Sequence, residues 1–233
     1  MKYLCLVSLV TFSFNNIMAQ QAFEGNDSQM SIKVFDANGR PFVNPANDIA
    51  GSPFFLADWK YGNVTLNNDK VYSKRLLRIN FQSQEIHYLT ENNLEMSLPA
   101  GSVKEITLID SVKFPASQYL FRSGFPSIDN QNEKNFYLFV SKGKISLIKS
   151  FRTNVLVEQN DFTGQITKEY RIYEDYYFFT GAAILRIKKD KAYLVGILKD
   201  KKENIEVFIQ TNNLSCKSIQ DIKKIIDYYN LLQ

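Results

Sequence analysis

The sequence predicts a mainly β (α+β) fold, with an antiparallel β meander or curved sheet followed by two or three C-terminal α-helices. Apolar residues recur with a period of two from about residue 31 to residue 188, and the chain holds 18 Phe and 13 Tyr, which pack well on a pleated surface. After residue 188 the spacing changes towards that of amphipathic helices. We therefore expect an antiparallel β domain over residues 20–188 and a helical segment packing on the sheet over residues 189–233.

The strand pattern is clearest where apolar and polar residues alternate over a short run. Leu77, Ile79 and Phe81 fall on one face of a predicted strand, and Arg78 and Asn80 fall on the other. The same alternation recurs at Leu94, Met96 and Leu98. Residues that tolerate tight turns separate such runs, and we expect hairpin loops at Asn38-Gly39, Asn67-Asn68-Asp69, Asn92-Asn93 and Ala100-Gly101.

Two hairpins are predicted in the second half of the β domain. In the first, residues 135–140 pair with residues 145–149 through Ser141-Lys142-Gly143-Lys144, a short loop containing the glycine that a tight reversal needs. In the second, residues 170–173 pair with residues 183–187, with Thr180-Gly181 between them. Together these hairpins predict a meander.

The first segment after the β domain is ambiguous on pattern alone. Leu194 and Leu198 fit helical spacing, whereas Tyr193 and Val195 fit a strand almost as well. The local pattern therefore leaves residues 190–198 open.

Two helices are predicted beyond this segment. The first has an apolar stripe of Ile205, Phe208 and Ile209, and Asp200 with Glu203 has the spacing of an N-terminal capping box. The second is the more strongly patterned, with its cap offered by Ser218 and Asp221 and its apolar face formed by Ile219, Ile222, Ile225, Ile226 and Tyr229. We expect the chain to turn between them at residues 211–213.

The amino terminus has the features of an export signal. Lys2 gives a positive start, residues 3–12 form an apolar stretch too short for a permanent membrane span, and Ala19 offers the small residue that signal peptidase requires. We expect residues 1–19 to be a cleaved signal peptide, with cleavage between Ala19 and Gln20. Cys5 lies near the start of the apolar run, where it cannot serve as a lipoprotein cysteine, so no lipid anchor is expected.

Composition restricts the mature chain further. Cleavage would leave Cys216 as its one cysteine, so no intramolecular disulfide can form. The formal charge of +4 would fall to +3, because residues 1–19 contain one basic residue and no acidic one. Such a balance favours no nucleic-acid partner. No later stretch reaches about 18 consecutive apolar residues, so we expect no transmembrane anchor.

Stretches at both ends of the chain follow a recognisable pattern. They are Gly51-Ser52-Pro53-Phe54, residues 58–66 with Trp59 and Gly62, residues 77–80, residues 198–203, residues 222–226 and Tyr228-Tyr229-Asn230. These stretches resemble an uncharacterised family of secreted proteins from Bacteroidetes bacteria. The resemblance implies a helix over residues 190–198 and export to the envelope of a Gram-negative cell, in the periplasm or outside it. It implies no activity. Those relatives often carry a proline near the position of Lys199, which this chain lacks.

The single histidine and a pair of neighbouring acids are the first candidates for chemistry. His87 could act as a general base, but the alternation around it favours a solvent-facing strand residue. With one histidine and one mature cysteine, a zinc site of the usual nitrogen and sulfur ligands is excluded. Glu174 and Asp175, flanked by tyrosines, could be read as a carbohydrate site, yet adjacent strand residues point to opposite faces and would not flank one bond.

Four further features have a plain structural reading beside a functional one. Residues 129–133 hold oxygen ligands for calcium but lack the spacing of a dedicated loop, which favours a solvated turn. The lysines at positions 188, 189, 191, 199, 201 and 202 could meet an anionic surface, but a solvated helix face is favoured. Cys216 is read as a buried, inert thiol. Asp110-Ser111-Val112 matches the pattern at which Bacteroidetes attach O-linked glycans, which makes Ser111 a candidate O-glycosylation site.

These patterns lead to a binding function rather than a named reaction. No glycine-rich phosphate loop or nucleophile elbow is present, and we expect no catalytic residue, cofactor or metal ligand. The leading hypothesis is an exported, non-enzymatic envelope protein that acts as a binding or structural module for an envelope protein, lipid or glycan. One alternative is a protein that binds an apolar ligand such as a lipid or acyl chain. Another is a carboxylate-dependent hydrolase of cell-wall polymer or glycan.

Overall fold

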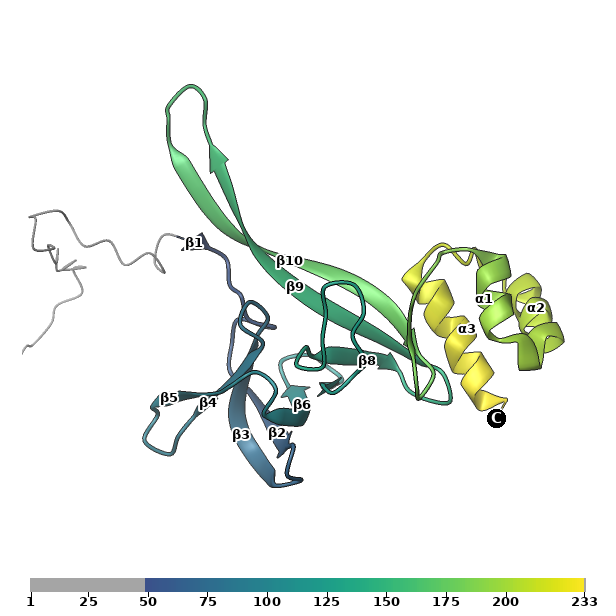
Figure 1. The fold of residues 1–233 in the computed structure, drawn as a ribbon, viewed down its shortest axis with the longest axis horizontal. Helices are drawn as coiled ribbons and strands as arrows, with labels where there is room; N and C mark the ends of the chain where they lie inside the picture. Colours follow the sequence, from purple (N-terminus) through teal and green to yellow (C-terminus); the bar gives the residue numbers. More distant parts are fainter. Residues whose placement is uncertain (1–48, 233) are drawn as a thin grey trace, which may run out of the picture. The chain divides into compact units, whose positions relative to one another are not determined.

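The computed structural model describes residues 49–232 (Figure 1). The predicted signal peptide with its cleavage site at Ala19 and Gln20, and the predicted turn at Asn38-Gly39, lie outside the described residues. Within residues 49–232 the chain forms one mixed sheet of eleven strands and then three α-helices. The prediction of a mainly β fold with C-terminal helices is therefore confirmed.

The strands follow one another along the chain with short connections. Their bounds are β1 Ile49–Ala50, β2 Lys60–Leu66, β3 Val71–Asn80, β4 Glu85–Leu89, β5 Glu95–Leu98, β6 Val103–Asp110, β7 Ser117–Arg122, β8 Tyr137–Ser141, β9 Ser146–Gln159, β10 Ile166–Phe179 and β11 Ile184–Arg186. In the sheet the order is β1-β10-β9-β8-β7-β6-β2-β3-β4-β5, and β11 also pairs with β10. Two antiparallel meanders, β2–β5 and β6–β10, thus join where β2 pairs with β6. Only the short β1 runs parallel to its neighbour, β10.

The first predicted hairpin is confirmed and the second is partly wrong. Strands β8 and β9 pair as expected around residues 142–145. Strand β11 does pair with β10, but with Tyr177, Phe178 and Phe179 rather than with residues 170–173. Residues 170–173 pair instead with residues 152–155 of β9. Both β9 and β10 are 14 residues long, and a local alternation does not reveal how far a strand continues.

The helices are α1 Lys191–Ile197, α2 Lys202–Thr211 and α3 Ile219–Leu231, with a 3-10 turn at Lys199–Lys201 before α2. Residues 191–197 are therefore helical, and the Asp190 side chain caps them by accepting from the Tyr193 amide. Ser218 caps α3 as predicted, since its hydroxyl accepts from the Asp221 amide. None of these helices is long and apolar enough to cross a membrane.

The predicted capping box of α2 is wrong. The residue at the N-cap is Lys201, and no side chain caps the helix. The Asp200 carboxylate instead accepts hydrogen bonds from Lys144 Nζ and Tyr229 Oη, which tie the start of α2 to the β8–β9 loop and to α3. These contacts with residues distant in the sequence replace the local cap that the spacing suggested.

The buried apolar residues form separate clusters. The sheet cluster gathers side chains from β2 to β9 and from residue 81, including Leu77, Ile79, Ile106 and Phe121. The helical cluster covers the other end of the sheet with the apolar faces of α1, α2 and α3, packed on Leu147 and Phe178. A third, smaller cluster contains Phe125, Tyr137, Ile148, Tyr177 and Ile184. The sheet and helical clusters share no residue.

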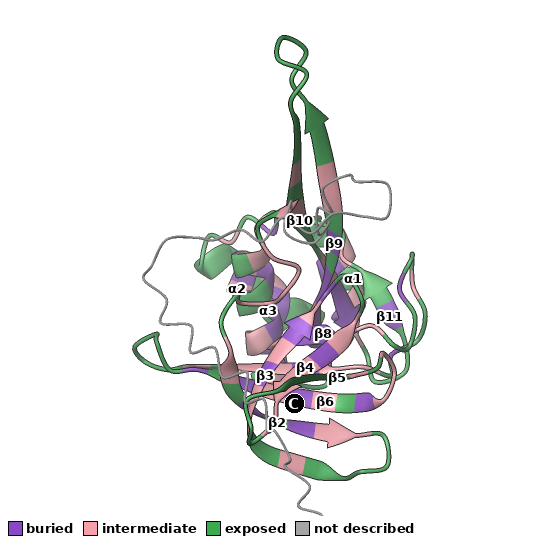
Figure 2. Cartoon of the chain, turned by 90° about the vertical axis from the view of Figure 1, so that its left-hand side faces the viewer, coloured by how far each residue is buried: buried purple, intermediate pink, exposed green. Residues whose placement is uncertain are grey.

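The outer part of the β9–β10 hairpin, residues 152–173, has few neighbours in the sheet. Strand β8 pairs with β9 only as far as Ser150, and β1 contributes two residues along β10. Figure 2 shows most of this part as exposed. We call residues 152–173 the outer hairpin.

Candidate functional site

A cleft of about 450 Å³ opens on the face of the sheet formed by β2, β3, β4 and β5. Its walls are mostly aliphatic and aromatic, and polar side chains from the middle of β3 and from the β4–β5 turn line the rest. The lining residues are Val64, Leu66, Tyr72, Arg75, Leu77, Tyr88, Leu89, Thr90, Glu91, Asn92 and Leu98. A concave, apolar site of this size with a few polar groups is typical of ligand-binding pockets.

Strand register brings these side chains to one face. Leu77 of β3 pairs with Tyr88 of β4, and Tyr88 pairs with Met96 of β5, so all three point to the same side. The register between β2 and β3 shifts between Gly62 and Val64. The shift lies beside Lys74 of β3, which has a positive φ. The shift places Val64 opposite Tyr72. The alternating pattern of each strand thus builds a shared apolar surface.

The cleft is a continuation of the sheet cluster that is left partly open. Val64 and Leu77, on its floor, are only 2% and 1% exposed. Leu66, Tyr72 and Leu89, on its walls, are half-buried. An apolar ligand would therefore meet a preformed hydrocarbon surface.

Charged groups stand at the mouth of the cleft. An Nη of Arg75 lies 3.8 Å from an Oε of Glu91, and the Arg75 side chain is 42% exposed while that of Glu91 is 90% exposed. Such a long, exposed pair is weak and leaves the guanidinium able to meet another anion. The Lys70 ammonium lies over the Tyr72 ring at 5.0 Å, and a hydrogen bond with Tyr72 raises the pKa of Lys70. The cleft is therefore lined by one cation, Arg75, and one carboxylate, Glu91, and Lys70 lies next to the lining residue Tyr72.

Exposed apolar side chains extend the cleft along the edge strand. Met96 is 49% exposed, and it shares the face of Tyr88 because the two residues pair. Leu94 precedes β5 and is 62% exposed. The sequence alternation at Leu94, Met96 and Leu98 predicted one buried face, but only Leu98 is half-buried. The reason is that β5 is the last strand of the sheet formed by residues 49–232, so it has a neighbouring strand on one side only.

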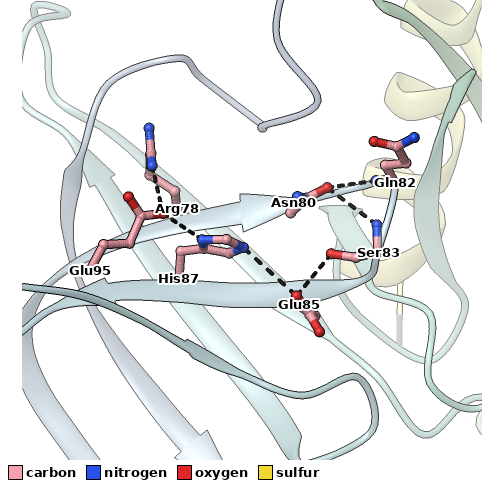
Figure 3. Close-up of polar contacts among 7 residues, drawn as sticks. All are labelled: Arg78, Asn80, Gln82, Ser83, Glu85, His87 and Glu95. Carbon is pink, nitrogen blue, oxygen red and sulfur yellow. Dashed lines mark hydrogen bonds and ion pairs between the residues drawn. The ribbon is translucent and has the colours of Figure 1, made fainter. Parts of the chain in front are cut away.

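The opposite face of the same strands carries a polar cluster (Figure 3). One Glu95 carboxylate oxygen accepts from Arg78 Nη2 at 2.8 Å and lies 2.6 Å from His87 Nδ1. These bonds lower the Glu95 pKa against the opposing effect of burial, which alone would raise it. Arg78 also lies between two aromatic rings, 4.1 Å from the centroids of both Phe54 and Trp59. The cluster joins β3, β4 and β5 to the segment that precedes β2.

The prediction that His87 simply faces solvent is wrong. The Phe54 ring contacts the imidazole edge-on at a centroid distance of 5.0 Å, and the side chain of His87 is only 18% exposed. The nearest hydroxyl in Figure 3, that of Ser83, donates to Glu85 rather than to the imidazole. Among residues 49–232, His87 contacts the carboxylates of Glu95 and Glu85 and the Phe54 ring, and none of these is a hydroxyl or thiol that it could activate as a nucleophile.

Glu174 and Asp175 lie on opposite faces of β10. Glu174 pairs with Lys149 at 2.9 Å and accepts from the Tyr176 hydroxyl, whereas Asp175 accepts from Arg152 Nε at 2.8 Å. The two carboxylates belong to different ion pairs. They cannot flank one glycosidic bond, which is what a pair of hydrolytic acids requires.

The predicted turn at residues 129–133 is tied down by side chains. Asp129 accepts from the Arg186 guanidinium and from the Tyr177 hydroxyl, and the Arg186 hydrogen bond is the main reason that the Asp129 pKa is lowered. A cavity of about 90 Å³ lies between these groups and Gln131, which is buried. In residues 49–232 no three acidic, histidine or cysteine side chains gather in a way that could hold a metal ion.

The remaining candidates lie apart from the cleft. Ser111 is exposed directly after β6, next to the buried Asp110, whose carboxylate accepts from Lys60 Nζ at 3.0 Å. Exposure is what glycan attachment would need, and the modification itself stays a prediction. Cys216 is 1% exposed, which confirms that it is buried. The six lysines of residues 188–202 are exposed except for Lys201, which is half-buried.

Sequence reasoning missed the cleft and the Arg78 cluster. Leu77 and Leu98 were correctly placed on alternating strands, and so was Arg78 on the opposite face. Their neighbours across the sheet depend on strand register and on the join between β2 and β6, which no local pattern reveals. The turn residues 90–92, which line the cleft, lead into the asparagine pair Asn92-Asn93, one of those that predicted hairpins. That asparagine pair was the only predicted feature of the sequence close to the cleft-lining turn.

Comparisons of the chain with models of protein families, with curated proteins and with solved structures found no match. The function is therefore argued from the geometry of the cleft.

Proposed function

We propose that this is an exported protein that binds an apolar ligand with an anionic head, such as a fatty acid or a lipid acyl chain, in the cleft of β2–β5. The observation that carries the proposal is an open, preformed cleft of about 450 Å³ with apolar walls and Arg75 at its mouth. Export is supported by the pattern of residues 1–19.

The expected binding energy comes mainly from hydrocarbon burial. Each methylene group that leaves water for an apolar wall contributes about 0.8 kcal/mol. Affinity should therefore rise with chain length until the cleft is full. The exposed Arg75 guanidinium adds up to about 1 kcal/mol for an anionic head, because surface ion pairs are weak. Longer chains should be distinguished from shorter ones more strongly than acids from alcohols.

A fluorescent fatty acid tests this directly. We expect its emission to rise on mixing with the purified protein, and unlabelled saturated acids to displace it with an affinity that grows from eight to about sixteen carbons. The corresponding alcohols should bind about fivefold less tightly than the acids. No displacement at any chain length would refute the proposal.

Three variants locate the binding site. Leu98→Trp fills the cleft, because Leu98 pairs with Ile86 on the face of Tyr88 and lines the cleft, and it should weaken binding about tenfold or more. Arg75→Gln should remove the preference for acids over alcohols and leave the chain-length dependence intact. The matched control is Leu185→Trp, because Leu185 is exposed on β11 and lines no part of the cleft. Equal loss of binding in both tryptophan variants would contradict a site in the cleft.

A second candidate function is docking of a partner protein, the leading hypothesis from the sequence. The observation that favours it is the apolar rim of Leu94 and Met96, which extends the cleft beyond what one acyl chain would cover. Exposed apolar patches that continue from a pocket are typical of protein interfaces.

A further inference from the structure

We propose that the partner docking in the cleft is a second copy of this chain, which inserts the tip of its outer hairpin so that copies associate head to tail. The inference rests on the cleft of the proposed function and names its macromolecular occupant. The tip is defined as residues 160–165, the loop that joins β9 to β10.

The tip presents one apolar side chain from an ordered turn. Phe162 is fully exposed, at 101%. Asn160 holds the turn, since its side-chain oxygen accepts from the amides of Phe162 at 2.9 Å and Thr163 at 3.0 Å. The Asn160 amide in turn donates to the Gln165 carbonyl at 2.9 Å. A preformed turn loses little conformational freedom when Phe162 is buried against a partner.

The apolar surface of the tip continues along one face of the outer hairpin. Cross-strand partners point to the same side, so the pairs Val157–Lys168 and Gln159–Ile166 place Val157 and Ile166 on one face. These two side chains are 57% and 58% exposed. An isolated two-stranded hairpin gains little stability by itself in water. A contact that covers Phe162, Val157 and Ile166 would therefore bury a coherent apolar patch.

The cleft and its rim match this patch in chemistry and extent. Phe162 would enter the apolar interior, and Val157 and Ile166 would face the rim formed by Leu94 and Met96. Charges complement one another as well. Among residues 49–232 Asp161, beside Phe162, makes no ion pair, and it would approach Arg75 of the cleft, whose own ion pair with Glu91 is long and exposed. Opposite charges at the edge of an apolar contact fix its orientation.

Other occupants fit less well. No residue of the tip lines the cleft of its own chain. Phe114 is another fully exposed aromatic residue, but its charged neighbour is Lys113, so it brings no carboxylate to Arg75. A contact between two different surfaces of the same chain is heterologous, so it forms rings or open chains of copies rather than a closed symmetric dimer.

Association of the purified protein is measured by sedimentation velocity between about 10 and 500 µM, since a small contact of this kind is expected to be weak. We expect the wild-type chain to form dimers and larger species as concentration rises, and Phe162→Asp to remain a monomer throughout. The matched control Phe114→Asp should associate like the wild type. A wild-type chain that stays monomeric at every concentration would overturn the inference.

Mixing two blocked variants tests the head-to-tail arrangement. Phe162→Asp has a blocked tip and an open cleft, whereas Leu98→Trp has a filled cleft and an intact tip. Neither should associate alone, and an equimolar mixture should form a heterodimer that cannot grow further. Association of Leu98→Trp alone would show that the contact lies elsewhere.

Ligand measurements separate this inference from the proposed function. Phe162→Asp should bind the fluorescent fatty acid with unchanged affinity, and a saturating fatty acid should dissociate wild-type assemblies. Fatty-acid binding without any association would overturn the inference and leave the proposed function standing. Association that depends on Phe162 and Leu98, without fatty-acid binding, would support the inference and overturn the proposed function.

Discussion

At the scale of single residues, Gly62 shows how closely the strands approach. It lies in β2 where the register with β3 shifts, opposite Leu108 of β6. A Cβ atom there would lie 2.2 Å from the Thr107 carbonyl oxygen and 3.1 Å from the side chains of Leu108 and Leu77. Only glycine therefore fits beneath the cleft.

Gly62→Ala is expected to lower the free energy of unfolding by about 2–3 kcal/mol, because backbone atoms must move to admit a methyl group. Urea unfolding measures the change. Gly196→Ala is the matched control, since nothing lies within 4 Å of its added Cβ and the residue sits in α1. That variant should gain up to about 1 kcal/mol from helix propensity. Similar losses in both variants would contradict the steric account.

The buried Tyr177 hydroxyl predicts a loss of stability in alkali. Burial raises the pKa of Tyr177 to about 12, with a further contribution from its hydrogen bond to Asp129. An unfolded tyrosine ionises near pH 10. Between pH 10 and 12 the unfolded chain has therefore lost this proton while the folded chain keeps it, so the stabilisation is complete below pH 10 and declines as the pH rises.

We expect this decline to amount to about 1–2 kcal/mol in urea unfolding between pH 10 and 12. Tyr177→Phe should reduce the slope. Tyr61→Phe, at a residue that is 60% exposed, should keep the wild-type slope. If the free energy of unfolding of Tyr177→Phe falls with pH as steeply as that of the wild type, the assignment of the alkaline loss of stability to Tyr177 is wrong.

Sequence patterns predicted residue burial well where the strand is central. Leu77, Ile79 and Phe81 are buried as expected. His87 was misplaced because its exposure depends on Phe54, a residue distant in sequence that covers it. A period of two tells which face a residue occupies and leaves open what packs on that face.

At the scale of elements, the cap of α3 is the clearest local determinant. The Ser218 hydroxyl accepts from the Asp221 amide at 3.0 Å. Ser218→Ala should cost about 1 kcal/mol in urea unfolding, because an amide of the first turn loses its acceptor. Gln220→Ala, at an exposed position of the same helix, should change stability by less than about 0.5 kcal/mol. A cost in the control as large as that of Ser218→Ala would contradict the assignment.

Elements were predictable where their determinants are local. The β8–β9 hairpin follows from a glycine loop between two alternating runs, and α3 follows from its cap and apolar stripe. The length of β10 and the role of Asp200 were not predictable, because both depend on partners elsewhere in the chain. For the same reason, residues 190–198 were ambiguous until their packing in the helical cluster was known.

At the scale of the whole molecule, the separation of the sheet and helical clusters predicts two unfolding steps. Ile225→Ala in the helical cluster and Ile106→Ala in the sheet cluster should each cost about 2–4 kcal/mol. Trp59, the single tryptophan, contacts Arg78 on the sheet and reports on that end by fluorescence. Circular dichroism at 222 nm reports on the helices.

Ile225→Ala should therefore shift the dichroism transition to lower urea and leave the fluorescence transition in place. Ile106→Ala should shift the fluorescence transition instead. Coincident shifts of both signals in both variants would show that the clusters unfold as one unit.

The cleft belongs to this scale, which is why the sequence did not reveal it. Its lining comes from four strands and one turn, and it lies beside β5, the last strand of the sheet formed by residues 49–232. Composition suggested an apolar site through the abundance of aromatic residues, but the aliphatic residues at positions 64, 66, 89 and 98 form most of its wall. The position of a cleft depends on which residues pack over a face of the sheet. The alternation of residues within one strand does not encode this packing.

The burial of Cys216 has a kinetic consequence. This residue lies between α2 and α3 within the helical cluster, and burial raises the pKa of its thiol. A thiol reacts with a disulfide reagent only as an accessible thiolate. The rate at which Cys216 is labelled can be followed by absorbance in the native protein. This rate therefore reports how often the helical end opens. The chain carries this reporter at the natural position, without an added probe.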